Sequence, residues 1–218
     1  KLYVKASITD IKQNLEPLIG SNIDHIQDKS RTTLSFTKPS SDYLIRDIIR
    51  LTDGKTDHSG MRVHKEIFSK SNNEKIYFLK GFSDVTGYIR RSNYFFTEYK
   101  HRVYIETNNN WQLVADICNL LKDVGVPVQT IDWAHPNMRD SNLKKYNEGK
   151  RDFWKKEHQI KIFVNEFKPI GFGVIHKQQA LENFIAELEQ GYLTAGKKSS
   201  DETHKFYWEK KLKTKEKF

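Results

Sequence analysis

The sequence lacks the features of a secreted or membrane-spanning protein. Its 218 residues contain one cysteine, Cys118, which lies within an apolar helical pattern and is therefore expected in the core. One cysteine cannot build a disulfide framework, and this fits a reducing compartment. No apolar run is long enough to span a membrane, and no signal peptide is visible. We therefore expect an intracellular protein, located in the cytoplasm, the nucleoid or an organelle.

Several motifs of catalysis are also missing. The chain has no Walker loop, no dinucleotide fingerprint and no nucleophile elbow. His58 and His64 lie near Asp53 and Asp57, but their spacing matches no zinc pattern. We therefore interpret residues 53–60 as a polar loop and not as a metal site.

Acidic residues are in deficit. The chain has 37 Lys and Arg against 28 Asp and Glu, which gives a formal charge of +9 and a pI near 9.4. This balance favours a polyanionic partner, although surplus lysine also promotes solubility. Two stretches are especially basic, residues 139–157 and the C-terminal tail 191–218. Acids are interspersed in both, so each stretch fits either phosphate binding or a solvated surface.

The residue patterns predict an α+β fold. In the first part we expect a strand at 2–8, a helix at 9–19, strands at 22–28 and 32–37, and a helix at 41–52. In the second part we expect a helix at 74–85, strands at 87–97 and 101–107, a helix at 110–123, strands at 126–133 and 158–164, and a final helix. The chain begins at Lys1 and not at Met, as a fragment or a processed chain does.

Two segments carry a family resemblance. Residues 79–87 (LKGFSDVTG) resemble the nine-residue motif of the LAGLIDADG homing endonucleases, with Gly81 in the third position and Asp84 in the sixth. Residues 170–181 (IGFGVIHKQQAL) are similar to a segment near the end of many family members. The resemblance covers residues 74–190. It implies an αββαββα unit with a curved antiparallel sheet that binds DNA.

The motif departs from the family at one position that matters for catalysis. In active members the eighth residue is the acid that binds the divalent metal, and here it is Thr86. A hydroxyl lacks the charge that holds a hard cation. The resemblance places Lys177 near the active site, so the candidate catalytic residues are Asp84 and Lys177, with Asp84 as the metal ligand if the chain is active. A shifted metal site would combine Asp84 with Glu106 or Asp132.

The order of the expected elements indicates a weak internal repeat. The elements expected within residues 1–60 follow the same order as those from strand 101–107 onward. We interpret residues 1–60 as a partial LAGLIDADG-like unit without its motif helix, 74–190 as a further unit, and 191–218 as a basic tail. Monomeric family members pack two units through their motif helices. The resemblance therefore implies that helix 74–85 pairs with a second copy of the chain or with a missing N-terminal segment.

A DNA-binding sheet would present alternating side chains to the major groove. Arginine pairs there with guanine, and asparagine or glutamine with adenine, while basic residues of the 139–157 stretch would contact phosphates. The candidate DNA-binding residues are Arg90, Arg91, Asn93, Tyr94, Lys100, His101, Arg102, Gln129, Asp132, His135, Lys144, Lys145, Lys150, Arg151, Lys155 and Lys156. The same alternation is typical of any solvated face of an antiparallel sheet.

Three hypotheses follow. The first is a sequence-selective double-stranded DNA-binding domain without cleavage activity or cofactor, as in the recognition part of a nuclease or restriction system or in a regulator. The second is an active homing-type endonuclease that uses magnesium. The third is an RNA- or protein-binding module that shares the fold. Duplex binding weakens steeply as salt rises, whereas the third class would bind without salt dependence or prefer single strands.

Overall fold

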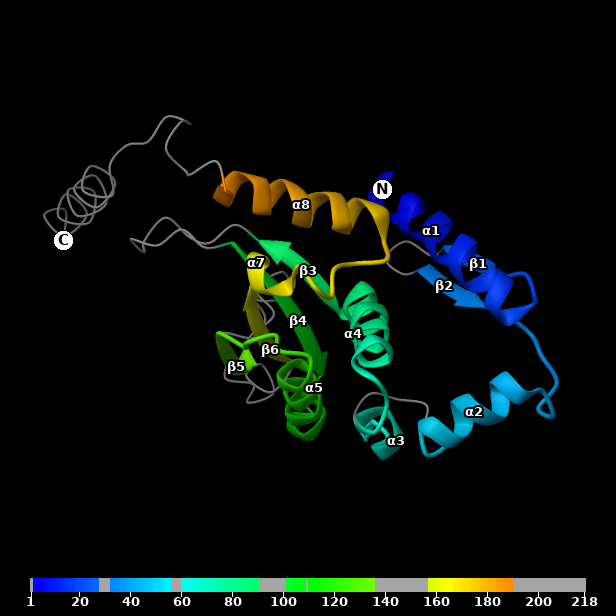
Figure 1. Cartoon of the computed structure of the whole chain (residues 1–218). Helices are drawn as coiled ribbons and strands as arrows, with labels where there is room; N and C mark the ends of the chain where they lie inside the picture. The colour runs from blue at the N-terminus through cyan, green and yellow to red at the C-terminus, as the bar shows by residue number, and fades with distance from the viewer. Residues whose placement is uncertain are drawn as a thin grey trace, which may run out of the picture.

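The computed structural model describes residues 2–27, 32–55, 60–90, 101–108, 110–135 and 157–189. This part of the chain has the expected α+β fold, with two antiparallel sheets and the helices around them. Figure 1 shows the larger sheet with its helices and, to one side, a smaller group of N-terminal elements. The larger sheet positions the candidate site.

The larger sheet has the strand order β3-β4-β6-β5, and its neighbouring strands are antiparallel. Its elements and helices are, in chain order, α4 (Asn72–Thr86), β3 (Gly87–Arg90), β4 (Arg102–Asn108), α5 (Trp111–Asp123), β5 (Thr130–His135), β6 (Glu157–Phe163), α7 (Val164–Phe167) and α8 (Ile175–Glu189). The expected succession of helices and strands is present in this half. The strand expected at 126–133 starts later, at Thr130.

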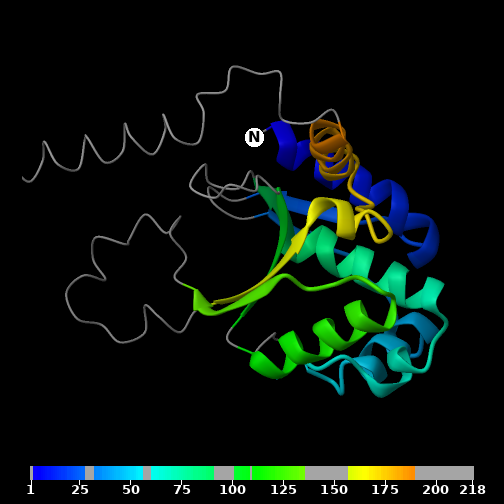
Figure 2. The same ribbon diagram turned by 60° about the vertical axis from the view of Figure 1, so that its left-hand side comes forward.

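Alternation along the strands separates a core face from an outer face. Val103, Ile105, Ile160 and Ile162 are fully buried and join residues of α4, α5, α7 and α8 in one hydrophobic cluster. Successive strand residues point to opposite faces, so the intervening side chains form the outer face. Figure 2 shows α4 and α5 on the same side of the sheet. The hydrophobic cluster lies between the sheet and these helices, and no described residue of the outer face belongs to it, although Tyr104 and Gln159 on that face are also buried.

Specific residues account for where helix α4 begins and where it ends. At its start, Ser71 and Glu74 form a capping box, in which the Ser71 amide donates to the Glu74 carboxylate at 3.0 Å. At its end, Gly87 begins β3, and a Cβ there would lie 2.6 Å from the carbonyl oxygen of Ser83. This turn therefore requires glycine. Gly81, in the middle of the helix, is exposed and has no atom within 4 Å of the position that a Cβ would occupy.

The N-terminal region begins with a helix, and the strand expected at 2–8 is wrong. Helix α1 (Leu2–Ile19) covers both this segment and the helix expected at 9–19. A short apolar run fits either period, and here α1 packs against α8. Asp10 lies inside α1, and its Oδ2 accepts a hydrogen bond from the amide of Ile175 at 3.0 Å.

A small sheet and a further helix follow α1. β1 (Asp24–Gln27) pairs antiparallel with β2 (Thr32–Ser35), and α2 (Tyr43–Leu51) begins after the N-cap Asp42. These elements confirm the expected strand pair and helix, within shorter bounds. The predicted repeat is wrong in its first element because residues 2–19 contain no strand. The succession of helix, two strands and helix nevertheless occurs in both halves.

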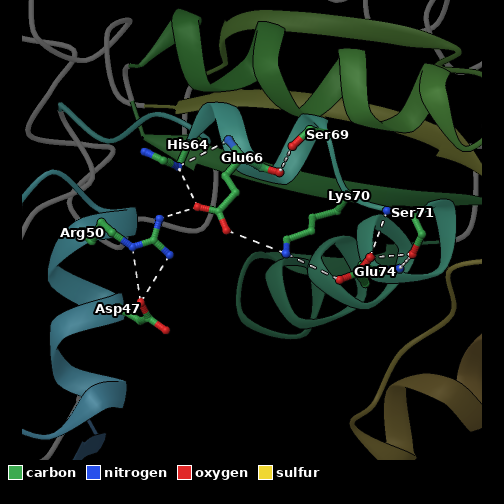
Figure 3. A network of polar contacts seen from close by, with 8 residues as sticks. All are labelled: Asp47, Arg50, His64, Glu66, Ser69, Lys70, Ser71 and Glu74. Carbon is green, nitrogen blue, oxygen red and sulfur yellow. Dashed lines mark hydrogen bonds and ion pairs between the residues drawn. The ribbon is translucent and has the colours of Figure 1, made fainter.

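Helix α2 is amphipathic, yet none of its residues is buried. Tyr43 and Ile49 on its apolar face are 84% and 52% exposed. An ion pair between Arg50 and Glu66 links α2 to the short helix α3 (Lys65–Phe68), within the polar network shown in Figure 3. Exposed ion pairs stabilise by only about 0–1 kcal/mol, so this link holds α2 weakly.

Candidate nucleic-acid interface

The outer face of the larger sheet carries charged, amide and aromatic side chains in cross-strand rows. We call them the arginine row (Arg90, Arg102, Phe163), the tyrosine row (Tyr88, Tyr104, Lys161, Thr130) and the acidic row (Glu106, Gln159, Asp132). Each row follows the strand register, so its members are neighbours on one surface. The charge therefore changes sign along the strands, from two arginines to two carboxylates.

The arginine row presents cations supported by aromatic rings. The guanidinium carbon of Arg102 lies 5.5 Å from the ring centre of Phe163, and its Nε donates to Oε1 of Gln129 at 2.5 Å. Arg90 is exposed, and its guanidinium carbon lies 5.9 Å from the ring centre of Tyr104. A cation–π contact orients a guanidinium without neutralising it. Both arginines therefore keep their positive charge on the outer face.

The tyrosine row is a stacked platform. The rings of Tyr88 and Tyr104 are 5.2 Å apart and nearly parallel, at 4°. Lys161 lies 5.6 Å from the ring centre of Tyr104 and also forms an ion pair with Asp132. The charge of Lys161 is therefore partly balanced by the acidic row, unlike the charges of the two arginines.

Hydrogen bonds hold the acidic row in place. Oε1 of Glu106 accepts from the Tyr88 hydroxyl and from Nε2 of Gln159, each at 2.7 Å. Gln159 is buried beneath this network. Glu106 thus connects the acidic row to the tyrosine row, and both carboxylates of the acidic row are used within the outer face.

The structure brings Asp84 and Lys177 together, and both side chains bind backbone groups. Oδ1 of Asp84 accepts from the amides of Gly173 and Val174 at 3.0 and 3.1 Å, just before α8 begins. Nζ of Lys177 donates to the carbonyl oxygens of Asp84 and Gly87 at 2.7 and 2.6 Å, where α4 ends. We call this arrangement the crossed cap, because each helix supplies a side chain that satisfies the end of the other.

Burial shifts the pKa values of both groups in the crossed cap. Desolvation raises the pKa of Asp84, although the amides of Val174 and Gly173 and the charge of Lys177 oppose this. Desolvation also lowers the pKa of Lys177, against the attraction of Asp84. Both shifts favour the neutral forms, as expected for groups withdrawn from water.

The residues considered as metal ligands are used elsewhere. Thr86, at the position of the metal-binding acid, donates its hydroxyl to the carbonyl oxygen of Phe82 at 2.8 Å. Glu106 and Asp132 make their contacts on the outer face of the sheet. Within the described ranges, no three His, Cys, Asp or Glu side chains gather as a metal-binding group. The shifted site with Asp84 is therefore not assembled among these residues.

His101 does not lie with the DNA-binding candidates, and its predicted place on the reading surface is wrong. Its side chain is buried, its ring lies 4.4 Å from the ring centre of Phe184, and Nε2 is 3.1 Å from Oε2 of Glu187. It lies two residues before Val103, so its side chain points toward the same face of the sheet, the core face. Helix α8 covers it there.

The remaining candidates divide into two groups. Arg90, Arg102 and Asp132 lie on the outer face, Gln129 binds Arg102 there, and His135 pairs with Glu157 at the end of β5. The candidates outside the described residues are Arg91, Asn93, Tyr94, Lys100, Lys144, Lys145, Lys150, Arg151, Lys155 and Lys156. The basic tail 191–218 also lies outside them.

Sequence reasoning missed six residues of the outer face: Tyr88, Tyr104, Thr130, Gln159, Lys161 and Phe163. They occupy the positions that alternate with the apolar core-face residues of the four strands. Strict alternation on these strands would have found them, because a residue two positions from an outer-face residue lies on the same face.

A separate open hollow of about 930 Å³ lies between α5 and β5, with Cys118 and Trp133 in its lining. Burial raises the pKa of the Cys118 thiol to about 11. The thiol is therefore protonated at neutral pH, and a protonated thiol is a poor nucleophile. This agrees with its interpretation as a packing residue.

Comparisons of the chain with protein-family models, curated proteins and solved structures give no match. None of the described helices has both the length and the apolar character needed to cross a membrane.

Proposed function

We propose that this chain is a sequence-selective, double-stranded DNA-binding domain on a LAGLIDADG-like scaffold that does not itself cleave DNA. The observation that carries the proposal is the arginine row. It places Arg90 and Arg102 in cross-strand register on the outer face of an antiparallel ribbon. A two-stranded ribbon fits the major groove, and arginine there can bind both phosphates and guanine.

The charge pattern of the outer face supports the same proposal. Glu106 and Asp132 in the acidic row would repel phosphates, but carboxylates accept hydrogen bonds from the N4 amine of cytosine. A face with cations at one end and acceptors at the other suits a groove in which the phosphates flank the base edges. The arrangement therefore favours reading of bases together with phosphate contact.

The order of the elements supports the LAGLIDADG-like scaffold. From α4 onward the chain runs helix, two strands, helix, two strands and a final helical segment, with β4 and β6 at the centre of the sheet. Gly87, the last residue of the motif, is also the residue at which α4 turns into β3. Both features are those that the resemblance implies.

The contacts of Asp84 favour binding over cleavage. Oδ1 and Oδ2 of Asp84 each lie 3.0 Å from the amide nitrogen of Gly173. A divalent cation would compete for these oxygens, because such ions are held by carboxylate oxygens. An active, magnesium-dependent endonuclease would therefore have to open the crossed cap.

Helix α4 also has a surface suited to pairing with another helix. Tyr77 and Val85 are 71% and 78% exposed, and Gly81 lies between them on the same stripe. A glycine at this place permits close approach of a second backbone. This supports pairing of α4 with a second copy of the chain or with another unit, as the resemblance implies.

The test is a salt-titrated selection from a randomised duplex pool, with and without magnesium, analysed on a denaturing gel. Intact, enriched duplexes whose binding weakens with salt would support the proposal. Magnesium-dependent cuts would favour the endonuclease, and equal or better binding of single strands would favour the third hypothesis. No binding to any duplex would reject the proposal.

Two matched variants test the sheet as the contact surface. Arg90→Ala should lower duplex affinity about three- to tenfold and reduce the slope of log affinity against log salt by about one. Arg46→Ala is the control, because Arg46 on α2 is also exposed and lies 6.0 Å from the ring centre of Tyr43. Equal effects of both variants would contradict binding by the sheet.

A further inference from the structure

The side-chain contacts of Arg102 differ from those of Arg90 and Lys161, the other described cations of the outer face. Its Nε donates to Oε1 of Gln129 at 2.5 Å, and its guanidinium carbon lies 5.5 Å from the ring centre of Phe163. Phe163 is also its cross-strand partner on β6. The side chain of Arg102 therefore extends from β4 across β6 to the residue that precedes β5.

The backbone of Gln129 is held at the sheet, and its exposed side chain reaches Arg102. Its backbone amide donates to the carbonyl oxygen of Lys161 at 2.9 Å, which ties it to β6 immediately before β5 begins. Its side-chain oxygen is the acceptor in the bond to Arg102. A glutamine needs both its oxygen and its amine to bind adenine in the major groove. The bond to Arg102 therefore argues against the adenine-reading role that the sequence suggests for Gln129.

The contacts with Gln129 and Phe163 neither neutralise the Arg102 guanidinium nor use its two terminal amino groups. Gln129 and Phe163 are both neutral, whereas the neighbouring Lys161 is paired with the carboxylate of Asp132. Only Nε of Arg102 is hydrogen-bonded to a described residue. The terminal amino groups carry further N–H donors, and a pair of such donors binds O6 and N7 of guanine.

We propose that Arg102 is the guanine-reading residue of the sheet and that Gln129 is the positioning residue that orients it. The proposal rests on the proposed DNA-binding function and specifies how one base is recognised. Because Gln129 limits the orientations of the guanidinium, the arginine loses less side-chain freedom when it binds the base.

The first experiment uses the duplex that the wild-type chain enriches from the randomised pool. Each guanine in it is replaced in turn by 7-deazaguanine, which removes the N7 acceptor and keeps base pairing. Wild-type affinity should fall about tenfold at one guanine. Arg102→Met should abolish this loss, because methionine has no N–H donor for N7, and should reduce the salt slope by about one. Arg46→Met is the matched control and should retain the full loss.

The second experiment separates positioning from contact. Gln129→Met removes the acceptor at similar size and should reduce the 7-deazaguanine effect severalfold. Gln129→Glu keeps an acceptor and should preserve the effect, while its added charge lowers affinity for all duplexes. A purely structural role would not separate base preference from overall affinity in this way. Gln112→Met, at an exposed position of α5, is the control.

The outcomes distinguish this inference from the proposed function. Enrichment of a duplex by the wild-type chain, with Arg102→Met retaining the full loss at the same guanine, would overturn the inference and leave DNA binding intact. Unchanged base preference in Gln129→Met would overturn the role of Gln129. Absence of duplex binding by the wild-type chain would overturn both proposals.

Discussion

Residues 60–189 and residues 2–55 are stabilised by different means. The described part of the first region forms one hydrophobic cluster, which includes Leu121 and Phe167, and no described side chain before Val63 belongs to that cluster. In residues 2–55, Ile19 and Ile23 are the buried hydrophobic residues among the described side chains. The N-terminal elements are regular, yet they share little of the core.

The comparison shows that a regular helix does not imply a buried face. The apolar pattern of α2 correctly predicts a helix, but Ile49 is 52% exposed. The N-terminal region depends instead on individual polar links, such as Asp10 to the amide of Ile175 and Arg50 to Glu66. Five predictions test this difference, from the largest expected effect to the smallest.

Removing a core side chain should destabilise the protein far more than removing an apolar side chain of α2. Leu121 is fully buried, so Leu121→Ala should lower the free energy of unfolding by about 2–5 kcal/mol. Ile49→Ala should change it by about 0.5 kcal/mol or less. Urea denaturation followed by circular dichroism measures both. Equal losses would show that the face of α2 is buried and would contradict the comparison.

A methyl group in the crossed cap should be costly. A Cβ at Gly173 would lie 2.7 Å from Oδ2 of Asp84, so Gly173→Ala should cost about 1–3 kcal/mol of folding stability. Gly81→Ala, with open space around it, should be neutral or stabilise by up to about 1 kcal/mol. Thermal unfolding compares the two. A neutral Gly173→Ala would mean that the crossed cap tolerates displacement of Asp84.

Loss of the link between the two regions should loosen α1. Asp10→Ala leaves the amide of Ile175 without its acceptor and should lower stability by about 1 kcal/mol. Limited proteolysis should then cut within residues 2–19 faster, while residues 60–90 stay protected. The control is Asp24→Ala, an exposed residue of β1. Uniform acceleration of cleavage across the chain would contradict a local role for Asp10.

The crossed cap should also give a pH dependence. The pKa of Asp84 is raised in the folded protein, so the folded state binds this proton more tightly than the unfolded state does. The contribution of Asp84 to stability is present at low pH and is lost as pH rises through its folded-state pKa. Relative to Asp84→Asn, the wild-type chain should lose stability as pH rises above about 4, the ordinary pKa of an aspartate. The opposite slope in urea titrations would contradict the burial of Asp84.

The ion pair between α2 and α3 should have the smallest effect. The side chains of Arg50 and Glu66 are 47% and 37% exposed, so Arg50→Ala should cost at most about 0.5 kcal/mol. The loss should shrink in 1 M salt, where screening is strong (a Debye length of about 3 Å). Arg46→Ala on the same helix is the control. A loss that persists in high salt would show that Arg50 stabilises the link by packing.

Local patterns predict much of residues 60–189. The start of α4 follows from Ser71 and Glu74, and α5 begins at the N-cap Asn110, close to the expected bound. In this region the residues that the apolar periodicity places on one face are also the residues buried in the core. Local pattern and tertiary packing therefore favour the same structure. Of the candidates named along β3 and at the start of β4, Arg90 and Arg102 lie on the outer face, and His101, next to Arg102, lies on the core face.

Contacts between residues distant in sequence account for the errors. Residues 2–8 suit a strand locally, but α1 packs on α8 and uses Asp10 to bind a residue far along the chain. His101 stands between basic residues in the sequence, yet Glu187 and Phe184 of α8 bury it. The resemblance names Asp84 and Lys177 as candidate catalytic residues, and both side chains bind backbone groups at the ends of α4 and α8. Their backbone partners, however, cannot be inferred from a motif.

The crossed cap joins α4 and α8 at two separate points. A single hydrogen-bonded contact would act as a pivot, whereas two contacts also resist twisting of one helix about the other. One of these points is the carbonyl oxygen of Gly87, the first residue of β3. The direction in which the sheet leaves α4 is therefore set by Lys177, which lies 90 residues further along the chain. The first strand of the sheet is thus anchored at its start by a side chain of the last described helix.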